Sequence, residues 1–392
     1  MKIKNKFWAI APVIILSAIV YTSCQPLREF ENIPVYKGTG NQNLKAVPYN
    51  KSKKTVVIVA NNKGTEIFDL MAPYYLFNAT EKANVYVVAE KKSPIVLLKG
   101  LFIYPNLTFS EMDSLKIVPD VIVIPAMIGV FKDPKSPIIK WIKEKHNTDT
   151  KILSVCVGSL VGSATGLYDG KPITTHASDI ENSKTLFKNP HWIQNIAVTK
   201  SDNLFSTAGV SNAVEGSLTI IKEMYGKETL QKVMKDIHYP DAEIKIEHKS
   251  LAIETSHKFT IANKLIFRKN RKIGILLQDG INELHLAAVL DTYHRTFPSA
   301  LDTVMTHGVS VTSKYGLTII PTNDLNDTKL DELHILLPNT ISKSELERLK
   351  EIPLIKYNTT ENQYIINQCL QRIKEQYGQN FENITKLLLD YN

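Results

Sequence analysis

Residues 151–165 have the sequence Lys-Ile-Leu-Ser-Val-Cys-Val-Gly-Ser-Leu-Val-Gly-Ser-Ala-Thr. The first five residues are typical of a buried strand, and the segment from Leu160 onward is compatible with a helix. Cys156, Gly158 and other small residues stand between the two, where they permit a sharp turn. The stretch therefore predicts a strand, a tight turn that carries a cysteine, and a helix, which together form a unit of an α/β fold.

A repeat organises the rest of the chain. In each copy an apolar run is followed by a glycine and a helical period, and a second glycine follows the first at the same separation in both copies. An identical separation is hard to obtain by chance, so we expect two copies of one domain. The matching segments are 55–60, 67–77, 100–105, 121–125 and 221–226 in the first copy and 273–277, 284–290, 316–321, 334–338 and 373–378 in the second.

Within each copy, apolar runs alternate with helical periods, as buried parallel strands alternate with crossover helices. We therefore predict an α/β fold with a doubly wound, mostly parallel sheet flanked by helices, in two tandem copies of which the second is truncated. The predicted division is a signal or lipoprotein segment (1–24), a tether (25–53), a first domain with the cysteine turn (54–236), a linker (237–271) and a degenerate second domain (272–392).

Residues 1–24 predict export. Three lysines precede an apolar stretch from Phe7 to Val20, and Tyr-Thr-Ser-Cys24 follows. This order resembles a bacterial lipoprotein signal, in which Cys24 carries the lipid. An uncleaved membrane anchor and a buried core helix are the alternatives, because the apolar stretch is short for a membrane span. In the first two cases the body of the protein is exported and attached to the membrane.

The composition is that of a globular protein, with 43% hydrophobic and 22% charged residues. The net charge of +8 comes from scattered lysines and arginines without a recognition-helix pattern. We therefore expect a solvated basic surface near an anionic membrane and no nucleic-acid partner. The histidines and cysteines show no metal-binding spacing, and no phosphate-binding glycine loop is present. We accordingly expect no metal and no other cofactor.

Cys156 is the candidate functional residue. A strand-to-helix turn holds its side chain above the sheet in a strained backbone, as in a nucleophile elbow. The N-terminus of the following helix is expected to lower the pKa of the thiol and to increase its reactivity. The alternative is a cysteine that only fills the core at the end of an apolar strand, which is common.

Several sequence blocks, found in the expected order, resemble motifs of the PfpI/ThiJ family. They are most similar to the amidase-like domain of AraC-type transcriptional regulators. The family belongs to the class I glutamine amidotransferase-like superfamily, so the resemblance implies the fold of that superfamily for 54–236 and, without its middle, for 272–392. The blocks are Ser154–Ser159, Gly166–Gly170, Thr174–His176 and Ser206–Val210.

The resemblance implies three catalytic residues. The nucleophile of the family falls on Cys156, its histidine on His176 and its acidic residue on Asp69, four positions before Pro73. In such a trio a thiolate attacks, an imidazole moves protons and a carboxyl group hydrogen-bonds the sulfur. The alternatives are a helix-terminal charge for Asp69 and a structural histidine packed under the loop for His176.

Two positions depart from the family. Its Pro-Gly-Gly is Pro-Ala-Met127 here, and the amide at this place normally completes an oxyanion hole with the amide after the nucleophile, here that of Val157. A side chain at Met127 is expected to narrow the pocket or to turn that amide away. Val157 also lacks the hydroxyl that isonitrile hydratases of the family carry there, which disfavours hydratase chemistry.

The second copy is expected to lack this chemistry. His285 takes the position of Asp69, and the cysteine turn falls in the missing stretch. Cys369 aligns with Ser217 on the last helix, so it is not a displaced nucleophile. A structural or ligand-binding role is left for this copy, including cover over the first site by intramolecular pairing, because related domains of the superfamily often pair across their pocket faces.

These observations favour an exported, membrane-anchored module that binds or senses an unknown small molecule and retains a reactive Cys156. The alternative is a cysteine-dependent hydrolase or amidase-like enzyme that acts on a small amide or carbonyl substrate. A third interpretation is a relative of the transcriptional regulators without their DNA-binding domain, which the export signal disfavours.

Overall fold

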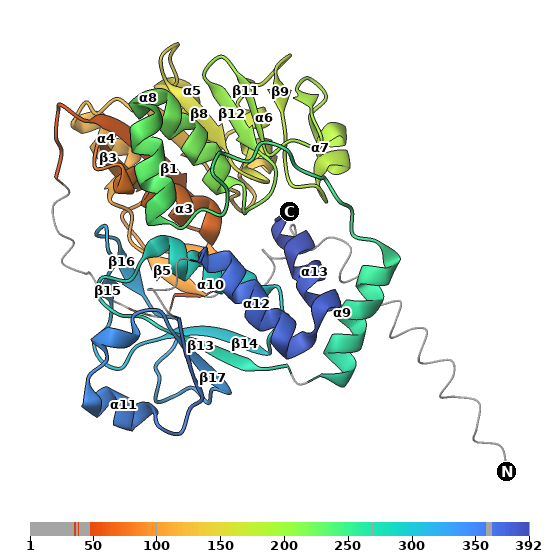
Figure 1. The fold of residues 1–392 in the computed structure, drawn as a ribbon. Helices are drawn as coiled ribbons and strands as arrows, with labels where there is room; N and C mark the ends of the chain where they lie inside the picture. The colour runs from red at the N-terminus through yellow and green to blue at the C-terminus, as the bar shows by residue number, and fades with distance from the viewer. Residues whose placement is uncertain are drawn as a thin grey trace.

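The computed structural model describes residues 35–36, 38, 48–98, 100–268, 270–357 and 363–391. The signal segment with Cys24, and most of the predicted tether, lie outside the described residues. Figure 1 shows two α/β parts, an upper one coloured red to green and a lower one coloured mainly teal to blue. Within the described ranges, no helix combines the length and the apolar character that a membrane crossing requires.

The first half of the chain forms a sheet and the helices that cover it. The sheet contains β1 (Lys54–Ala60), β3 (Ala83–Ala89), β6 (Leu107–Thr108), β7 (Val121–Ile124), β8 (Lys151–Ser154), β11 (Val198–Ser201) and β12 (Leu204–Thr207). The helices are α3 (Ile67–Ala79), α4 (Phe109–Ser114), α5 (Pro137–Lys145), α6 (Gly158–Ala164), α7 (Ile180–Leu186) and α8 (Ala213–Asp236). Short elements complete this half: η1 (Val130–Lys132), β9 (Pro172–Ile173) and β10 (His191–Trp192).

The strand order in this sheet is β11-β12-β8-β7-β1-β3-β6. Only the β11–β12 pair is antiparallel. The apolar run of β1 explains how both faces become covered: Val56 and Ile58 pack into the cluster with α3 and α8, whereas Val57 and Val59 pack into the cluster with α4 and α5. The predicted doubly wound, mostly parallel sheet is therefore confirmed.

The second half repeats the centre of this arrangement in a smaller form. Its parallel sheet contains β13 (Lys272–Leu276), β14 (Ala300–Val304), β17 (Glu332–Ile335) and β18 (Leu354–Lys356). The helices are α9 (Thr255–Phe267), α10 (Glu283–His294), α11 (Lys343–Leu349), α12 (Ile365–Tyr377) and α13 (Gln379–Leu389), with η2 at Pro338–Thr340. The order β14-β13-β17-β18 corresponds to β3-β1-β7-β8 of the first half, so the truncated second copy is present.

The two copies also end in the same way. Gly226 interrupts α8 with φ 82°, and Gly378 separates α12 from α13 with φ 92°. Both values lie in the left-handed region, which a residue without a Cβ adopts readily. A left-handed residue follows each of the two helical segments as well: His238 with φ 51°, two residues beyond α8, and Asp390 with φ 53°, directly after α13.

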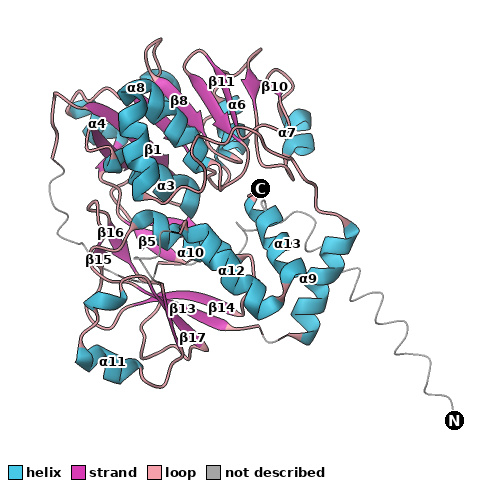
Figure 2. Cartoon of the chain, viewed as in Figure 1, coloured by secondary structure: helices cyan, strands magenta, loops and turns pink. Residues whose placement is uncertain are grey.

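The two halves share a small sheet and a continuous core. This sheet has the order β15-β16-β5-β4-β2, and the antiparallel contact of β5 with β16 joins the halves (Figure 2). Helix α3 packs against α10, and both contribute to one hydrophobic cluster. The strands are β2 (Thr65–Glu66), β4 (Ile95–Leu98), β5 (Leu101–Ile103), β15 (Val311–Thr312) and β16 (Thr318–Ile320).

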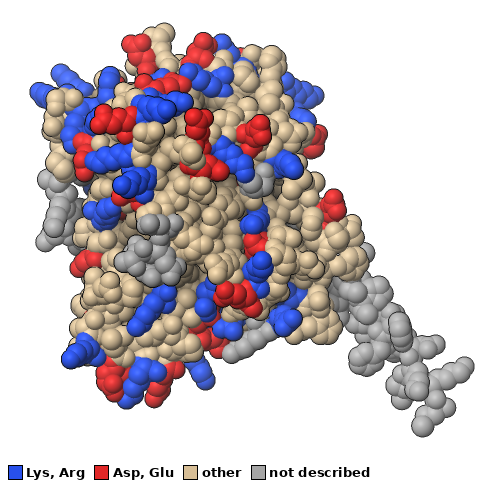
Figure 3. Space-filling model, viewed as in Figure 1, with Lys and Arg blue, Asp and Glu red and all other residues tan. Residues whose placement is uncertain are grey.

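Charged residues of both signs are interspersed over the face shown in Figure 3. Several basic side chains are paired with carboxylates, for example Lys54 with Asp120 at 2.7 Å and Lys232 with Glu81 at 2.7 Å. Exposed pairs of this kind contribute little to stability.

Candidate functional site

The cysteine turn has the backbone expected of an elbow. β8 ends at Ser154 and α6 begins at Gly158, and Cys156 between them has φ 52°. A non-glycine residue in this region stores strain of about 1–3 kcal/mol, which the surrounding structure must hold in place. A Cβ at Gly158 would collide with the carbonyl groups of Ile124 and Pro125, so only glycine fits this turn.

Two other sequence blocks fix the backbone of Cys156. Its N–H donates to the Thr207 hydroxyl at 3.4 Å, and the Thr175 hydroxyl donates to its carbonyl oxygen at 3.0 Å. Thr207 ends β12, and Thr175 directly precedes His176. The structure thus brings together three blocks that were recognised separately in the sequence.

Asp69 is fully buried near the sulfur, at the third position of α3. Its Oδ2 accepts a hydrogen bond from the Ala126 amide at 2.9 Å, and its own N–H donates to Glu66 Oε2 at 2.7 Å. Glu66 is buried too, and its N–H donates to the Ala126 carbonyl at 2.9 Å. The sequence did not single out Glu66, because glutamate is not among the residues preferred at helix N-caps.

The environment raises the pKa of the Cys156 thiol well above its ordinary value. Burial is the largest cause, followed by the carboxyl groups of Asp69, Glu66 and Asp179; the Val157 amide, which faces the sulfur, acts in the opposite direction. The predicted lowering of this pKa is therefore wrong. The helix N-terminus is present, but the thiol is only 3% exposed and burial disfavours its charged form.

His176 lies beside the elbow, but its ring bonds elsewhere. Nε2 is 3.3 Å from the Leu388 carbonyl, which can only accept, so Nε2 carries the hydrogen. Nδ1 accepts from the Ser178 N–H at 3.2 Å and also contacts the Ser178 hydroxyl at 2.9 Å. Among the described residues no hydrogen bond joins the ring to Cys156, and both ring nitrogens are engaged by other partners.

The two amides expected to form an oxyanion hole have different surroundings. The Val157 amide faces the sulfur. Met127 pairs with Thr65 in an antiparallel bridge, and the hydrogen bonds flanking this bridge use the neighbouring amides of Glu66 and Ile128. The Met127 side chain is 3% exposed and packs into the core on the α4 and α5 side of the sheet. The Ala126 amide, and not the Met127 amide, donates to the Asp69 carboxyl group.

The equivalent place in the second copy has different chemistry. His285 is the third residue of α10, as Asp69 is of α3, and the predicted correspondence of the two positions holds along the helix. β18 occupies the place of β8, but Tyr357 follows it where the first copy approaches its cysteine turn. The Tyr357 hydroxyl lies 2.8 Å from Nδ1 of the buried His334. Cys369 is buried on α12, as expected for a residue equivalent to Ser217.

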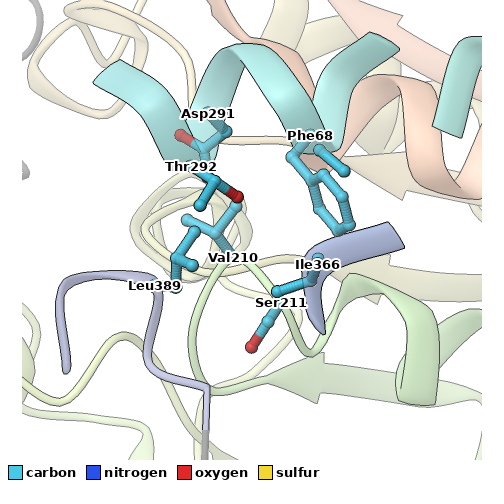
Figure 4. Close-up of a pocket in the computed structure, with 8 residues that line it drawn as sticks. Phe68, Val210, Ser211, Asp291, Thr292, Ile366 and Leu389 are labelled. Carbon is cyan, nitrogen blue, oxygen red and sulfur yellow. The ribbon is translucent and has the colours of Figure 1, made fainter. Parts of the chain in front are cut away.

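The described part of the chain contains no group of three or more His, Cys, Asp or Glu side chains arranged to hold a metal ion. One small cavity lies between the halves, lined by residues from both (Figure 4). Its walls include Phe68, next to Asp69 on α3, and Leu389, next to the residue whose carbonyl meets His176. The cavity therefore lies at the boundary between the two halves, on the side of the first half that carries Asp69.

Comparisons with known proteins agree with this geometry. Residues 53–223 match the sequence profile of the DJ-1/PfpI family. Isonitrile hydratase of Pseudomonas putida is 30% identical over 177 residues, which cover 44% of this chain and 74% of that protein. Protein dj-1beta of Drosophila melanogaster is 26% identical over 137 residues, which cover 34% of this chain and 71% of that protein.

Two solved structures resemble part of the chain. The crystal structure of Drosophila melanogaster DJ-1beta is 21% identical, with a TM-score of 0.42, and covers 47% of this chain and 96% of its own. A ThiJ/PfpI family protein from Pseudomonas syringae is 20% identical, with a TM-score of 0.43, and covers 53% of this chain and 84% of its own.

Proposed function

The chain belongs to the DJ-1/PfpI family, and from this premise we propose that its first copy binds or senses a small molecule through Cys156. The observation that supports this most strongly is the strained backbone of Cys156, which Thr207 and Thr175 hold at φ 52°. A cysteine that only filled the core would not need this conformation, because strain of this kind persists where the surrounding structure fixes it for a purpose.

The surroundings of the thiol favour binding over turnover. Acyl transfer needs a thiolate and a base that can take a proton near neutral pH. The buried thiol of Cys156 stays protonated, since burial and nearby carboxyl groups raise its pKa. His176 Nε2 donates to the Leu388 carbonyl and Nδ1 accepts from the Ser178 N–H, so both ring nitrogens are bonded away from Cys156. A thiol of this kind suits slow, reversible addition to a ligand carbonyl, in which its small thiolate fraction forms the sulfur–carbon bond and a proton returns to the carbonyl oxygen.

A second candidate is a cysteine-dependent hydrolase or amidase-like enzyme that acts on a small amide or carbonyl compound. The Val157 amide supports it, because a backbone donor beside the sulfur is close to where the oxygen of an attacked carbonyl group would lie. The relative from Pseudomonas putida is an isonitrile hydratase. We do not extend that activity to this chain, because Val157 has no hydroxyl next to the cysteine.

Adduct formation tests both candidates. The natural chain and Cys156→Ala are incubated with small aldehydes, amides and nitriles and analysed by mass spectrometry, with Cys369 as the internal reference. A reversible adduct on Cys156 without substrate loss supports binding. Continuous substrate hydrolysis that Cys156→Ala abolishes supports the enzyme. Absence of both would contradict a functional Cys156.

We also propose that the protein is exported and attached to the membrane through a lipid on Cys24. The basic and apolar order of residues 1–24 supports this proposal. Replacing Cys24 with Ser should move the protein from the membrane fraction to the soluble fraction of the cell envelope without affecting its fold. Membrane attachment that persists in Cys24→Ser would favour an uncleaved anchor.

A further inference from the structure

The end of α13 lies against the loops that surround Cys156. Its residues Leu388, Leu389 and Asp390 all bond to the first half: the Leu388 carbonyl meets His176 Nε2, and the Ser211 N–H donates to the Leu389 carbonyl at 3.3 Å. The Ser211 hydroxyl donates to the Asp390 carbonyl at 3.0 Å. Three consecutive residues of the second copy thus use donors that surround the elbow of the first.

The Asp390 carboxylate is enclosed by donors. Oδ2 accepts from the Ala177 N–H at 3.1 Å, and Oδ1 pairs with His248 Nε2 at 2.9 Å. The side chains of Asp390 and His248 are only 1% and 2% exposed. A buried carboxylate costs free energy unless hydrogen-bond donors surround it. The donors of Ala177 and His248 therefore form a binding position that suits a carboxylate.

Asp390 packs so closely against Gly209 that no side chain fits at position 209. Gly209 follows the β12 block, and a Cβ added to it would collide with the Cβ of Asp390. Gly209 is not in the left-handed region, so its backbone accepts alanine. Beside this contact lies the small cavity lined by Ser211 and Leu389 (Figure 4). The segment is therefore close-packed against Gly209 and borders a narrow gap between the two halves on its other side.

The first copy contains a counterpart of the contact that Leu388–Asp390 make with the first half. His238, two residues beyond the end of α8, has the left-handed conformation that Asp390 adopts directly after α13. Asp236 and His238 act electrostatically on His285, the counterpart of Asp69 in the second copy. The end of α8 thus lies near His285 of the second copy, and the end of α13 lies near His176 of the first copy. Of these two helix ends, only that of α13 lies beside a cysteine turn.

We propose that Leu388–Asp390 is an internal ligand that closes the Cys156 site, and that the external ligand which replaces it carries a carboxylate. Withdrawal of the segment frees the donors of Ala177, Ser211 and His248 and releases His176 Nε2. These buried donors need a new acceptor, which a ligand carboxylate supplies while the rest of the ligand reaches toward Cys156. This inference rests on the proposed function of Cys156.

Three variants test access to the thiol. Asp390→Gly removes the carboxylate, and glycine keeps the left-handed backbone without strain. Asp202→Gly is the matched control, because Asp202 also has a left-handed backbone, with φ 54°, but is exposed. Gly209→Ala displaces the segment and keeps Asp390. The measurement is the rate of iodoacetamide labelling at Cys156 at one fixed pH, with Cys369 as the reference for global opening.

We expect labelling of Cys156 to accelerate at least tenfold in Asp390→Gly and Gly209→Ala, and to stay unchanged in Asp202→Gly. Labelling of Cys369 should stay slow throughout. If Gly209→Ala also exposes Cys369, it has unfolded and Asp390→Gly decides alone. Unchanged labelling of Cys156 in the folded Asp390→Gly protein would overturn the closing role of the segment.

Chemical rescue tests the ligand class. Acetate added to Asp390→Gly should slow Cys156 labelling at least threefold, whereas acetamide, or sodium chloride at equal ionic strength, should not. Equal effects of acetate and acetamide would overturn the carboxylate assignment. Failure of the proposed function is distinguishable from either result, because it would appear as an opened Cys156 that labels rapidly and still forms no ligand adduct.

Discussion

The two copies begin their first helix with the same backbone device and place different chemistry on it. In α3, the Asp69 N–H donates to the capping Glu66 carboxylate at 2.7 Å; in α10, the His285 N–H donates to the capping Asn282 oxygen at 3.0 Å. The cap, the third helical position and the strand before it are retained. Asp69 in the first copy lies beside a cysteine, whereas His285 in the second copy does not. The backbone framework and the side-chain chemistry therefore vary separately in this repeat.

Asp69 and His285 also have different surroundings. Asp69 lies beside Cys156 and the Ala126 amide, inside the first half. The pKa of His285 is lowered to about 4, mainly by burial and also by the positive charge of Lys314. The second position is therefore a neutral residue near pH 7. The following changes test this contrast, in order of decreasing expected effect.

Gly158→Ala should have the largest effect, because its new methyl group collides with backbone carbonyls that cannot move independently. We expect a loss of about 3 kcal/mol in the free energy of unfolding, measured by urea denaturation. Gly274→Ala on β13 is the matched change in the second copy. Its methyl group meets the flexible side chain of Leu330, so the loss should be about 1 kcal/mol. Equal losses would break the contrast between a strained elbow and an ordinary strand.

His285→Gln should change the acid sensitivity of the protein. The folded pKa of about 4 lies below the ordinary value of 6.5, so in this range the unfolded chain binds a proton that the folded chain refuses. The free energy of unfolding should therefore fall as the pH falls from 6.5 to 4, by about 2 kcal/mol from this residue.

Urea denaturation across this pH range measures the effect, and His285→Gln should flatten the profile relative to the natural chain. The exposed His191 offers a control, since His191→Gln should leave the profile in place. A profile that His285→Gln does not alter would mean that this position is solvated and not a closed counterpart of Asp69.

Tyr75→Phe should have a smaller effect, confined to the boundary between the copies. The Tyr75 hydroxyl donates to Asp236 at 2.7 Å and accepts from Lys314 at 2.7 Å, so it links the first half to the β15–β16 turn of the second. Its loss should cost about 1 kcal/mol and speed amide hydrogen exchange around Lys314. Tyr168→Phe removes a hydrogen bond inside the first half and is the control. Equal exchange near Lys314 in both variants would refute a local link.

The sequence predicted the parts of the structure that depend on local order. The apolar run at Thr55 formed a central strand, and Cys156 with Gly158 formed the elbow, because strands and turns are determined by neighbouring residues. The repeat was recognisable for the same reason. Its glycines, such as Gly226 and Gly378, retain the special backbone that spacing alone had aligned.

What the sequence did not predict depends on contacts between distant residues. The Leu388 carbonyl reaches His176 across more than half of the chain, and no local pattern announces such a contact. The pKa of Cys156 was predicted in the wrong direction for this reason: the helix start is local, whereas burial and the approach of Asp179 arise only in the folded protein.

The most direct test of a closed, protonated site is the pH dependence of Cys156 alkylation in the natural chain. Because only the thiolate reacts, the rate should rise about tenfold for each pH unit between pH 6 and 9 without reaching a plateau. Asp69→Asn should bring the plateau to lower pH, since it removes a carboxylate that raises the thiol pKa. A plateau below pH 8 in the natural chain would show a preformed thiolate and would contradict the account.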